Sequence, residues 1–245
     1  MKPKNFKARE QKIINVAIAL IRQQSIDNFT IDKLVARVPF SKGTVYKHFI
    51  NKEDLLMAIS NQATTIFVDL LYRVCRFEGC TRERMCILNL TYVIFAVIHP
   101  KLFNIVLYSK SPCISKKSSF IRLKEQENLE IKMLNAAKGI VEEAVVKYNL
   151  VLPSFIDAYQ VSFANNSMCY GVISLLSSEN NGYEDYTSLV IEQELFNQNN
   201  LLLDGLNWLP LSRYKSYRSA IKKALIKIFP KEIEMMKMLG RELNF

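Results

Sequence analysis

The most informative side chains in this chain are the polar and basic ones of a short run, SKGTVYKHF, at residues 41–49. Hydroxyl groups can hydrogen-bond to phosphates or base edges, and lysine amines can bind phosphate oxygens or guanine O6 and N7. A tyrosine adds a ring that can pack on a thymine methyl group, and a glycine permits close backbone approach. The run therefore predicts contact with double-stranded DNA through Ser41, Lys42, Gly43, Thr44, Tyr46, Lys47 and His48.

Three helix starts surround this run. One pattern occurs three times: an apolar residue is followed by a capping residue, and a second apolar residue comes after three further positions. The three copies are Phe29-Thr30 to Leu34, Phe40-Ser41 to Val45, and Ile50-Asn51 to Leu55. Side chains of Thr, Ser and Asn accept hydrogen bonds from the free N–H groups of a first helical turn, and the apolar pair is the hydrophobic staple. Starts this close together predict a helix-turn-helix whose second helix carries the polar run.

The neighbouring elements follow from residue spacing. Residues 7–24 predict the first helix, because their apolar side chains recur on one face. Pro39 predicts the break before the polar helix, since proline cannot donate the next helical hydrogen bond. In the polar helix Val45 and Phe49 face inward, which leaves the other side chains toward solvent or a ligand. For any single lysine, tyrosine or histidine there, a solvated or core-packed side chain is the alternative.

The positive charge is concentrated at the N-terminus. The chain has a formal net charge of +10, and its first 52 residues hold eleven basic and three acidic residues, a net +8. A basic head on a nearly neutral body indicates an attached module that binds a polyanion. A second basic stretch, Arg213 to Lys231, is interpreted as a solvated face, with anionic lipid or flanking DNA as alternatives.

The rest of the 245 residues favours an all-α fold. Glycine and proline are scarce, seven of each, and apolar residues recur at helical spacing. We expect two domains, a head at 1–55 and a helical body at 56–245, joined within a fourth helix that ends near Cys75. Further helices are predicted at 83–98, 101–110, 120–149, 153–177, 184–203, 214–229 and 230–243, with Pro153 at the first helical position and a loop at 178–183.

The apolar segment 88–108 raises the question of a membrane span. His99, Pro100 and Lys101 interrupt it, so two buried helices that meet at this break are the preferred interpretation. The N-terminus is charged and lacks the apolar core of a signal peptide, which together with five cysteines in no paired spacing favours a reducing cytoplasm and no metal site. Cys75, Cys80 and Cys86 leave redox sensing open, with ordinary packing as the preferred alternative.

The head closely resembles the DNA-binding domain of the TetR family of bacterial repressors. The resemblance covers residues 7–57 and rests on FTIDKLVARV, SKGTVYKHF and NKEDLL. It implies that Thr30 meets a phosphate, that residues 41–44 begin the recognition helix, and that Lys52 holds a phosphate. One departure is Val38-Pro39-Phe40, where the family usually has Ala-Gly-Val, so this turn must be closed without the left-handed conformation of glycine.

The same resemblance implies a homodimer whose body binds an effector. We expect the two copies to pair through the helices at 155–177 and 184–203, as a four-helix bundle across a two-fold axis. An apolar or aromatic small molecule would release the repressor from a palindromic operator by a population shift. Candidate pocket residues, for each of which plain core packing is the alternative, are Phe95, His99, Phe103, Tyr108, Met133 and Tyr170.

Two other functional classes are alternatives to this one. A DNA-binding protein controlled by a protein partner, with no small-molecule ligand, is the main alternative. An enzyme is disfavoured because the chain has two histidines, no glycine-rich phosphate loop and no paired metal ligands, and no cofactor is expected.

Overall fold

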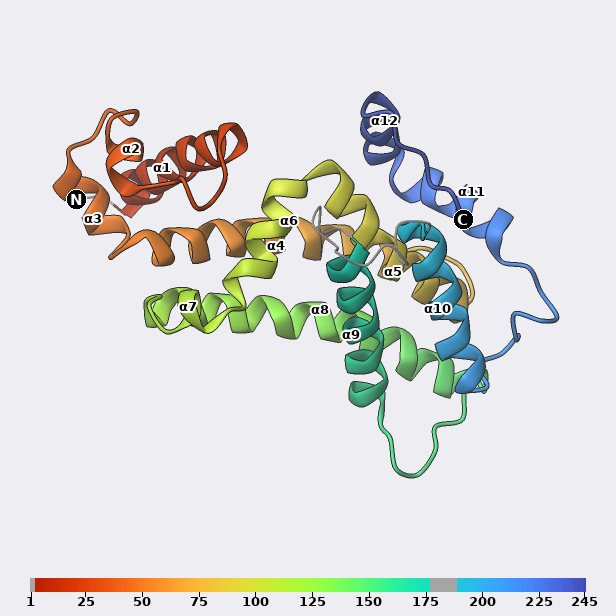
Figure 1. The fold of residues 1–245 in the computed structure, drawn as a ribbon. Helices are drawn as coiled ribbons and strands as arrows, with labels where there is room; N and C mark the ends of the chain where they lie inside the picture. The colour runs from red at the N-terminus through yellow and green to blue at the C-terminus, as the bar shows by residue number, and fades with distance from the viewer. Residues whose placement is uncertain (1–2, 177–188) are drawn as a thin grey trace. The chain divides into compact units, whose positions relative to one another are not determined.

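The computed structural model describes residues 3–176 and 189–245, and these form twelve helices and no strand (Figure 1). The all-α prediction is confirmed. The predicted loop at 178–183 and the start of the helix at 184 lie outside the described residues. The helices are α1 Pro3–Gln23, α2 Ile31–Val35, α3 Lys42–His48, α4 Lys52–Cys75, α5 Thr81–Ile98, α6 Pro100–Ser109, α7 Pro112–Ser115, α8 Phe120–Val146, α9 Ala158–Leu176, α10 Ile191–Gly205, α11 Arg218–Ile228 and α12 Pro230–Met238.

Residue contacts group the chain into two compact units. Unit 1 comprises residues 1–66 and 99–129, and unit 2 comprises residues 67–98 and 130–245. The predicted head at 1–55 therefore packs in one unit with α6, α7 and the first part of α8. The functional division into a head at 1–55 and a body at 56–245 stays a prediction.

Unit 1 contains a small apolar core under the N-terminal helices. Ile13 and Ala17 from α1, Phe29, Leu34 from α2 and Val45 from α3 are all fully buried. α1 contacts α2, and α2 contacts α3. The one-face spacing of α1 thus supplies the surface on which the two short helices rest.

Unit 2 is built around α5, which contacts α9, α10, α11 and α12. Because it is covered on several sides, α5 is buried from Thr81 to Phe95 at nearly every position, which explains its continuous apolar sequence. The break at His99 is confirmed: α5 ends at Ile98 and α6 begins at Pro100. α4 also passes a length-and-hydropathy test for a membrane span, with a mean hydropathy of 1.3, but 72% of that window is buried, as in a core helix.

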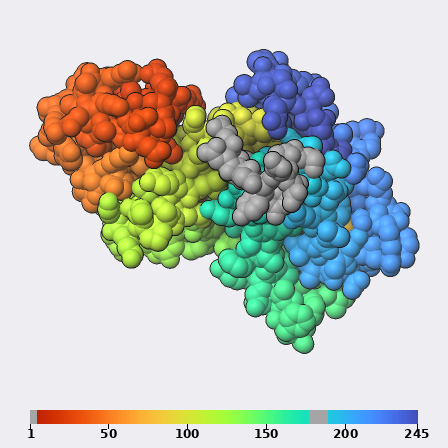
Figure 2. Space-filling model, viewed as in Figure 1, coloured from red at the N-terminus to blue at the C-terminus, as the bar shows by residue number. Residues whose placement is uncertain are grey.

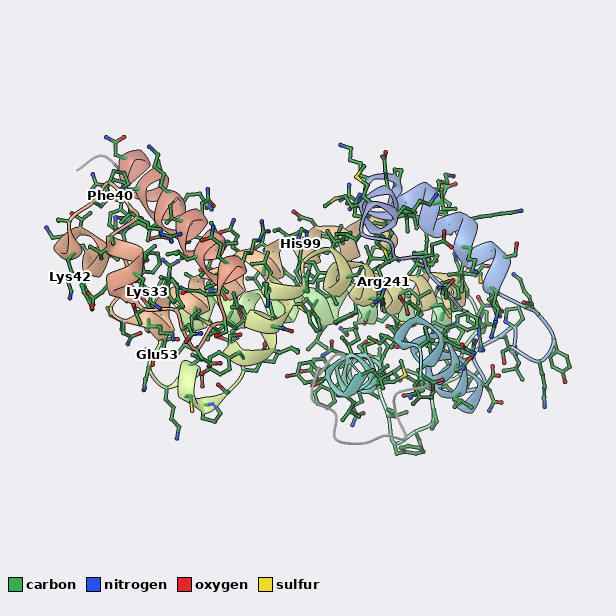
Figure 3. All side chains as sticks on the ribbon, turned by 45° about the horizontal axis from the view of Figure 1, so that its top comes forward. Lys33, Phe40, Lys42, Glu53, His99 and Arg241 are labelled. Atoms are coloured by element: carbon green, nitrogen blue, oxygen red, sulfur yellow. The ribbon has the colours of Figure 1, made fainter. Side chains whose placement is uncertain are left out.

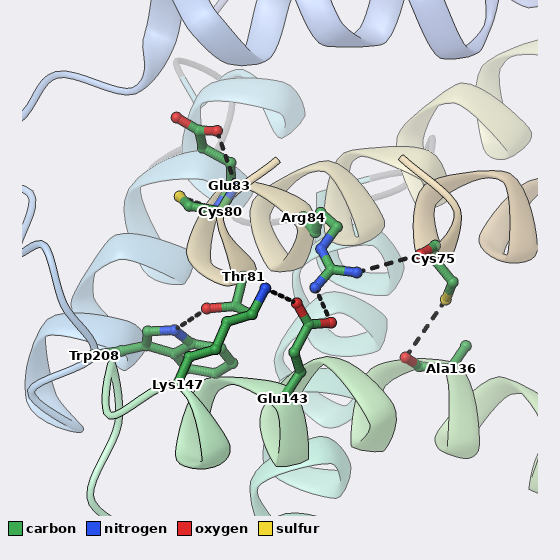
Figure 4. A network of polar contacts seen from close by, with 9 residues as sticks. All are labelled: Cys75, Cys80, Thr81, Glu83, Arg84, Ala136, Glu143, Lys147 and Trp208. Atoms are coloured by element: carbon green, nitrogen blue, oxygen red, sulfur yellow. Dashed lines mark hydrogen bonds and ion pairs between the residues drawn. The ribbon is translucent and has the colours of Figure 1, made fainter. Parts of the chain in front are cut away.

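A buried arginine connects the start of α5 to the loop after α10. The side chain of Arg82 is fully buried, and its guanidinium donates to the Trp208 carbonyl at 2.6 Å and pairs with Asp204 at 2.6 Å. Trp208 in turn donates its indole N–H to the Thr81 hydroxyl, and nearby Arg84 pairs with Glu143 of α8 (Figure 4). Burial alone would raise the pKa of Asp204. Hydrogen bonds from Ser212 and Arg82 lower it by a larger amount, so the pKa lies below its usual value.

Several predicted helix ends are wrong, and each has a local cause. α9 begins at Ala158 and not at Pro153, because Asp157 and Gln160 form a capping box with two reciprocal bonds of 2.8 Å. α12 ends at Met238 and not at 243, because Gly240 adopts φ 69° and the Arg241 N–H bonds back to the Met236 carbonyl.

Other boundaries shift by smaller amounts or add a short element. α1 starts at Pro3, four residues before the prediction, and α8 ends at Val146, followed by Tyr148 with φ 56°. α11 begins at Arg218 and not at 214, and α10 runs to Gly205. The polar connection after α6 contains the one-turn helix α7.

We expect Arg82→Met to lower the free energy of unfolding by about 3 kcal/mol, because it leaves Asp204 and the Trp208 carbonyl without their buried partner. Urea unfolding of the full chain measures this. Lys138→Met is the matched control, since its pair with Glu142 is partly exposed and contributes about 0.5 kcal/mol or less. Equal losses in the two variants would contradict the role assigned to Arg82.

Candidate nucleic-acid interface

The three capping side chains make the hydrogen bonds that the sequence predicts. Thr30 accepts from the Lys33 N–H at 3.3 Å, Ser41 from the Thr44 N–H at 3.3 Å, and Asn51 from the Asp54 N–H at 2.7 Å. Each cap satisfies a free N–H group and so fixes where its helix begins.

The staples are confirmed only in part. Phe29 and Leu34 of the first pair are both fully buried, whereas in the second pair Val45 is fully buried and Phe40 is half-buried. The third predicted staple is wrong, because Ile50 is 59% exposed. The start of α4 is fixed instead by two hydrogen bonds: the Asn51 side chain accepts from the Asp54 N–H, and the Asp54 carboxylate accepts from the Ile50 N–H at 3.3 Å.

The turn between α2 and α3 closes without a left-handed residue. After α2 the N–H groups of Arg37 and Val38 both bond to the Leu34 carbonyl, at 2.9 and 3.1 Å. Among the described residues, positive φ angles occur at Tyr148, Asn207 and Gly240, none of which lies in this turn. The proline of Val38-Pro39-Phe40 is therefore accommodated, since the turn does not need the conformation that glycine provides.

α3 separates its side chains into a buried face and an exposed one. Lys42, Gly43, Tyr46 and Lys47 are exposed, Tyr46 by 43%, together with Ser41 at the cap. These positions are one and four residues apart, so they share one side of the helix. Lys42 lies at the outer edge of the view in Figure 3.

Two of these residues show how accessible this face is. A methyl group at Gly43 would meet no other side chain or loop within 4 Å, so the glycine leaves open space above the helix. Thr44 is half-buried, and its hydroxyl lies 2.9 Å from the Ser41 hydroxyl. The face can therefore accept a close-fitting partner.

Lys42 is not a free charge in the unbound protein. Its amine lies 2.7 Å from an oxygen of Asp32 on α2, and the hydrogen bond with this carboxylate raises the pKa of Lys42. Both side chains are more than half exposed, so the pair is weak and can be exchanged for another anion. Asp32 therefore competes with any phosphate that approaches Lys42.

The two outlying candidates differ in accessibility. Thr30 is exposed at the start of α2, where its hydroxyl caps the helix. Lys52 is half-buried: its amine donates to the Ile26 carbonyl at 2.9 Å and lies 5.9 Å from the Phe29 ring centroid. Lys52 thus connects α4 to the loop after α1, a contact that sequence reasoning did not predict.

His48 does not lie on the exposed face, contrary to the prediction. Its ring is buried and stacks on Phe6 at 4.0 Å between centroids, with Nδ1 3.6 Å from a carboxylate oxygen of Glu10. Burial lowers the pKa of His48, partly opposed by Glu10. The residue belongs with Val45 and Phe49, three positions before it and one after, on the inward side of α3, and that helical spacing could have identified it.

A segment distant in sequence holds the head within unit 1. Glu10 also pairs with Arg122 of α8 at 2.7 Å. Before α8, the Lys117 carbonyl accepts from the Asn51 side chain at 2.8 Å, and the Ser119 N–H donates to Asp54 at 2.9 Å. The residues that cap α4 therefore also bind Lys117 and Ser119, and no local sequence signal reports such a contact.

The predicted ligand residues are not gathered around a described cavity. Phe95, Met133 and Tyr170 belong to unit 2, whereas His99, Phe103 and Tyr108 belong to unit 1. Phe95 is buried 5.4 Å from the Phe67 ring, Phe103 is buried, Tyr108 is 41% exposed, and His99 precedes the first residue of α6. The two described cavities are lined by other residues of unit 2.

Four of the five cysteines have the character of packed thiols, and the fifth, Cys113, is exposed. Burial raises the pKa of Cys75 and Cys80, raises that of Cys86 to about 12, and raises that of Cys169 further still. A thiol with a raised pKa carries little of the reactive thiolate. Among residues 3–176 and 189–245, no group of three His, Cys, Asp or Glu side chains is arranged to hold a metal ion.

We expect His48→Ala to lower the free energy of unfolding by about 1–3 kcal/mol, because it removes the ring that packs between Phe6 and Glu10. Lys47→Ala, at the adjacent exposed position, is the matched control and should stay within about 0.5 kcal/mol of the parent. Thermal and urea unfolding measure both. A neutral His48→Ala substitution would show that the ring does not support α3.

Comparison with known proteins finds similarity in the N-terminal residues and in the fold. Residues 13–59 match the sequence profile of "Bacterial regulatory proteins, tetR family". The fatty acid metabolism regulator protein of Bacillus subtilis is 20% identical over 144 residues, which are 58% of this chain and 71% of that protein.

Solved structures share the fold over most of the chain. A TetR/AcrR-family regulator from Thermobifida fusca has a TM-score of 0.59 at 21% identity, covering 81% of this chain and 98% of that one. AibR, solved with isovaleryl coenzyme A and operator DNA, has a TM-score of 0.55 at 20% identity, covering 82% of this chain and all of that one. The profile match shows that residues 13–59 are similar to the N-terminal domain of tetR-family regulatory proteins, and the solved structures show that the helical fold of the chain is shared with proteins that carry this domain.

Proposed function

We propose that the chain is a dimeric repressor that binds a palindromic operator through α3 and leaves it when the body binds a small apolar molecule. The observation that carries the proposal is the exposed face of α3, where Lys42, Gly43, Tyr46 and Lys47 stand on a helix whose opposite side is core. Such a protein acts in the cytoplasm, and its activity requires no enzymatic step.

The proposed DNA contact uses chemistry suited to a duplex. α3 enters the major groove, where the Lys47 amine binds guanine or phosphate and the Tyr46 ring packs on a thymine methyl group. Ser41, Thr44 and Thr30 bond to phosphates or base edges, and Lys42 exchanges Asp32 for phosphate. His48 is left out of the contact set because it is buried, and Lys52 acts mainly by holding the loop after α1.

A dimer is proposed because one head buries too little surface for strong specific binding. Two heads related by a two-fold axis would read half-sites about 34–36 Å apart. On α9, Tyr159 is 50% and Phe163 is 57% exposed, and these positions lie one helical turn apart with half-buried Tyr170 two turns further on. This apolar stripe supports pairing through the predicted helix at 155–177, with the helix at 184–203 beside it.

The chemical class of the proposed effector is suggested by proteins similar to this chain as well as by its own apolar and aromatic residues. AibR was solved with isovaleryl coenzyme A, and the curated Bacillus subtilis relative is a regulator of fatty acid metabolism. An acyl group carried on coenzyme A is therefore the first effector class to test for this chain. Within unit 2, Phe95 and Met133 are the proposed effector-site residues, because Tyr170 is assigned to the dimer stripe of α9. The roles of His99, Phe103 and Tyr108, which belong to unit 1, stay a prediction from the sequence.

A body controlled by a protein partner remains the second candidate. A thermal-shift screen with a series of acyl coenzyme A esters separates the two candidates. Stabilisation that saturates with one ester, accompanied by loss of operator binding, supports the small-molecule effector. No stabilisation by any ester, with operator binding unaffected, would favour the protein partner.

We expect Lys47→Ala and Tyr46→Ala each to weaken binding to a selected operator about tenfold without unfolding the protein, because both side chains are exposed and not part of the core. Fluorescence anisotropy at several salt concentrations measures this. If Lys47 binds phosphate, its removal also makes the dependence of affinity on salt less steep.

Asp32→Asn should act in the opposite direction and tighten binding, because it releases Lys42 and removes a negative charge near the phosphates. Lys138→Ala, on α8 of unit 2, is the control that should leave affinity unchanged. Unchanged operator affinity in both the Lys47 and Tyr46 variants would refute the assignment of this face.

We expect Phe163→Asp to shift the protein from dimer to monomer, because it places a charge in the apolar stripe of α9. Sedimentation velocity measures the shift. Phe120→Asp, at the 78% exposed start of α8, is the control that should remain dimeric. A Phe163→Asp protein that stays dimeric would exclude this stripe as the interface.

A further inference from the structure

Unit 2 contains a cavity of about 290 Å³ between α11, α12 and the C-terminal segment after Gly240. Leu225, Ile233 and Met236 form part of its apolar lining. Lys222, Lys237 and Arg241 also line it. None of these residues has a role in the proposed DNA contact or among the six candidate pocket residues, so the cavity is unexplained by the function above.

The walls of this cavity are held in place on both sides. Leu225 and Met236 are buried, and Phe229, fully buried where α11 meets α12, lies under the guanidinium of Arg73 at 4.8 Å. On the other side the chain turns at Gly240, and the Phe245 ring stacks on Phe196 at 5.2 Å. The C-terminal segment is therefore packed against unit 2 and forms a fixed wall of the cavity.

The charges around the cavity favour an anion. Lys237 and Lys222 have no acidic partner among the described residues, and the Lys222 amine lies 5.3 Å from the Phe245 ring centroid. Arg241 pairs at 3.3 Å with Glu192, whose side chain is 2% exposed. Glu242 is the one acidic residue in the lining, against three basic residues. The two unpaired lysines leave positive charge beside an apolar interior.

The size of the cavity limits what can bind there. A volume of about 290 Å³ lies at the lower end of the range for small-molecule sites and is too small for a helix of a protein partner. It also lacks room for a whole coenzyme A ester. The dark blue residues of α12 and the C-terminal segment form part of the surface seen in Figure 2. The cavity that they line is open to solvent on one side.

We propose that this cavity binds a small amphiphilic anion, an aliphatic chain of medium length that ends in a carboxylate or phosphate. The chain packs on Leu225, Ile233 and Met236, and the anionic group lies between Lys222 and Lys237. The site is separate from the proposed contact with DNA. Because α11 and α12 both contact α5, occupancy stabilises the helix on which unit 2 is assembled.

Isothermal titration of the full chain with decanoate, decyl phosphate and decanol tests this proposal. We expect both anions to bind with a one-to-one stoichiometry and decanol to bind at least fivefold more weakly. Comparing the two anions distinguishes a carboxylate ligand from a phosphate ligand. Because no DNA is present, failure here leaves the proposed repressor function to be judged by operator binding alone.

Two variants and a control make the site assignment falsifiable. Lys237→Gln, at an exposed position, should weaken decanoate about fivefold and leave decanol unchanged, whereas Ile233→Trp should block both ligands by filling the cavity. Lys223→Gln, an exposed lysine of α11 outside the lining, is the matched control. Absence of binding below the micelle concentration of the anions, or equal losses in the Lys237 and Lys223 variants, would overturn the proposal.

Discussion

A helix of seven residues is too short to be stable alone in water, so α3 depends on the contacts of its buried face. Ser41 fixes its first turn, Val45 and Phe49 anchor it in the core, and the His48 ring closes its end against Phe6 and Glu10. These contacts determine which side chains remain outside. The exposed polar face that we propose for DNA contact therefore exists only because the opposite face of the same short helix is buried.

Local signals were sufficient to predict much of the head. Thr30, Ser41 and Asn51 are capping residues by type and position, and all three make the predicted bonds. Apolar spacing likewise predicted the core and the all-α fold. The error at His48 came from treating residue polarity as evidence of exposure, although its spacing from Val45 places it inward. The start of α9 at Asp157 also had a local signal, a capping box that was overlooked.

Contacts between distant segments could not be predicted in this way. Glu10 meets Arg122, and the caps of α4 meet residues 117–119, across separations of many residues with no periodic pattern. In unit 2 a buried Asn89 on α5 bonds to Asn165 of α9 at 2.8 Å and to Asn199 of α10 at 2.6 Å. This network fixes how α9 and α10, the proposed dimer helices, pack on α5, because each buried amide needs its partner. A single sequence reports none of these pairings.

The most direct measurement is a structure of the dimer bound to an operator selected from random DNA. We expect α3 in the major groove, with Tyr46 and Lys47 against bases or phosphates, Asp32 separated from Lys42, and His48 still packed beside Glu10. A complex in which α3 faces away from the duplex, or in which another surface of the chain makes the DNA contact, would contradict it.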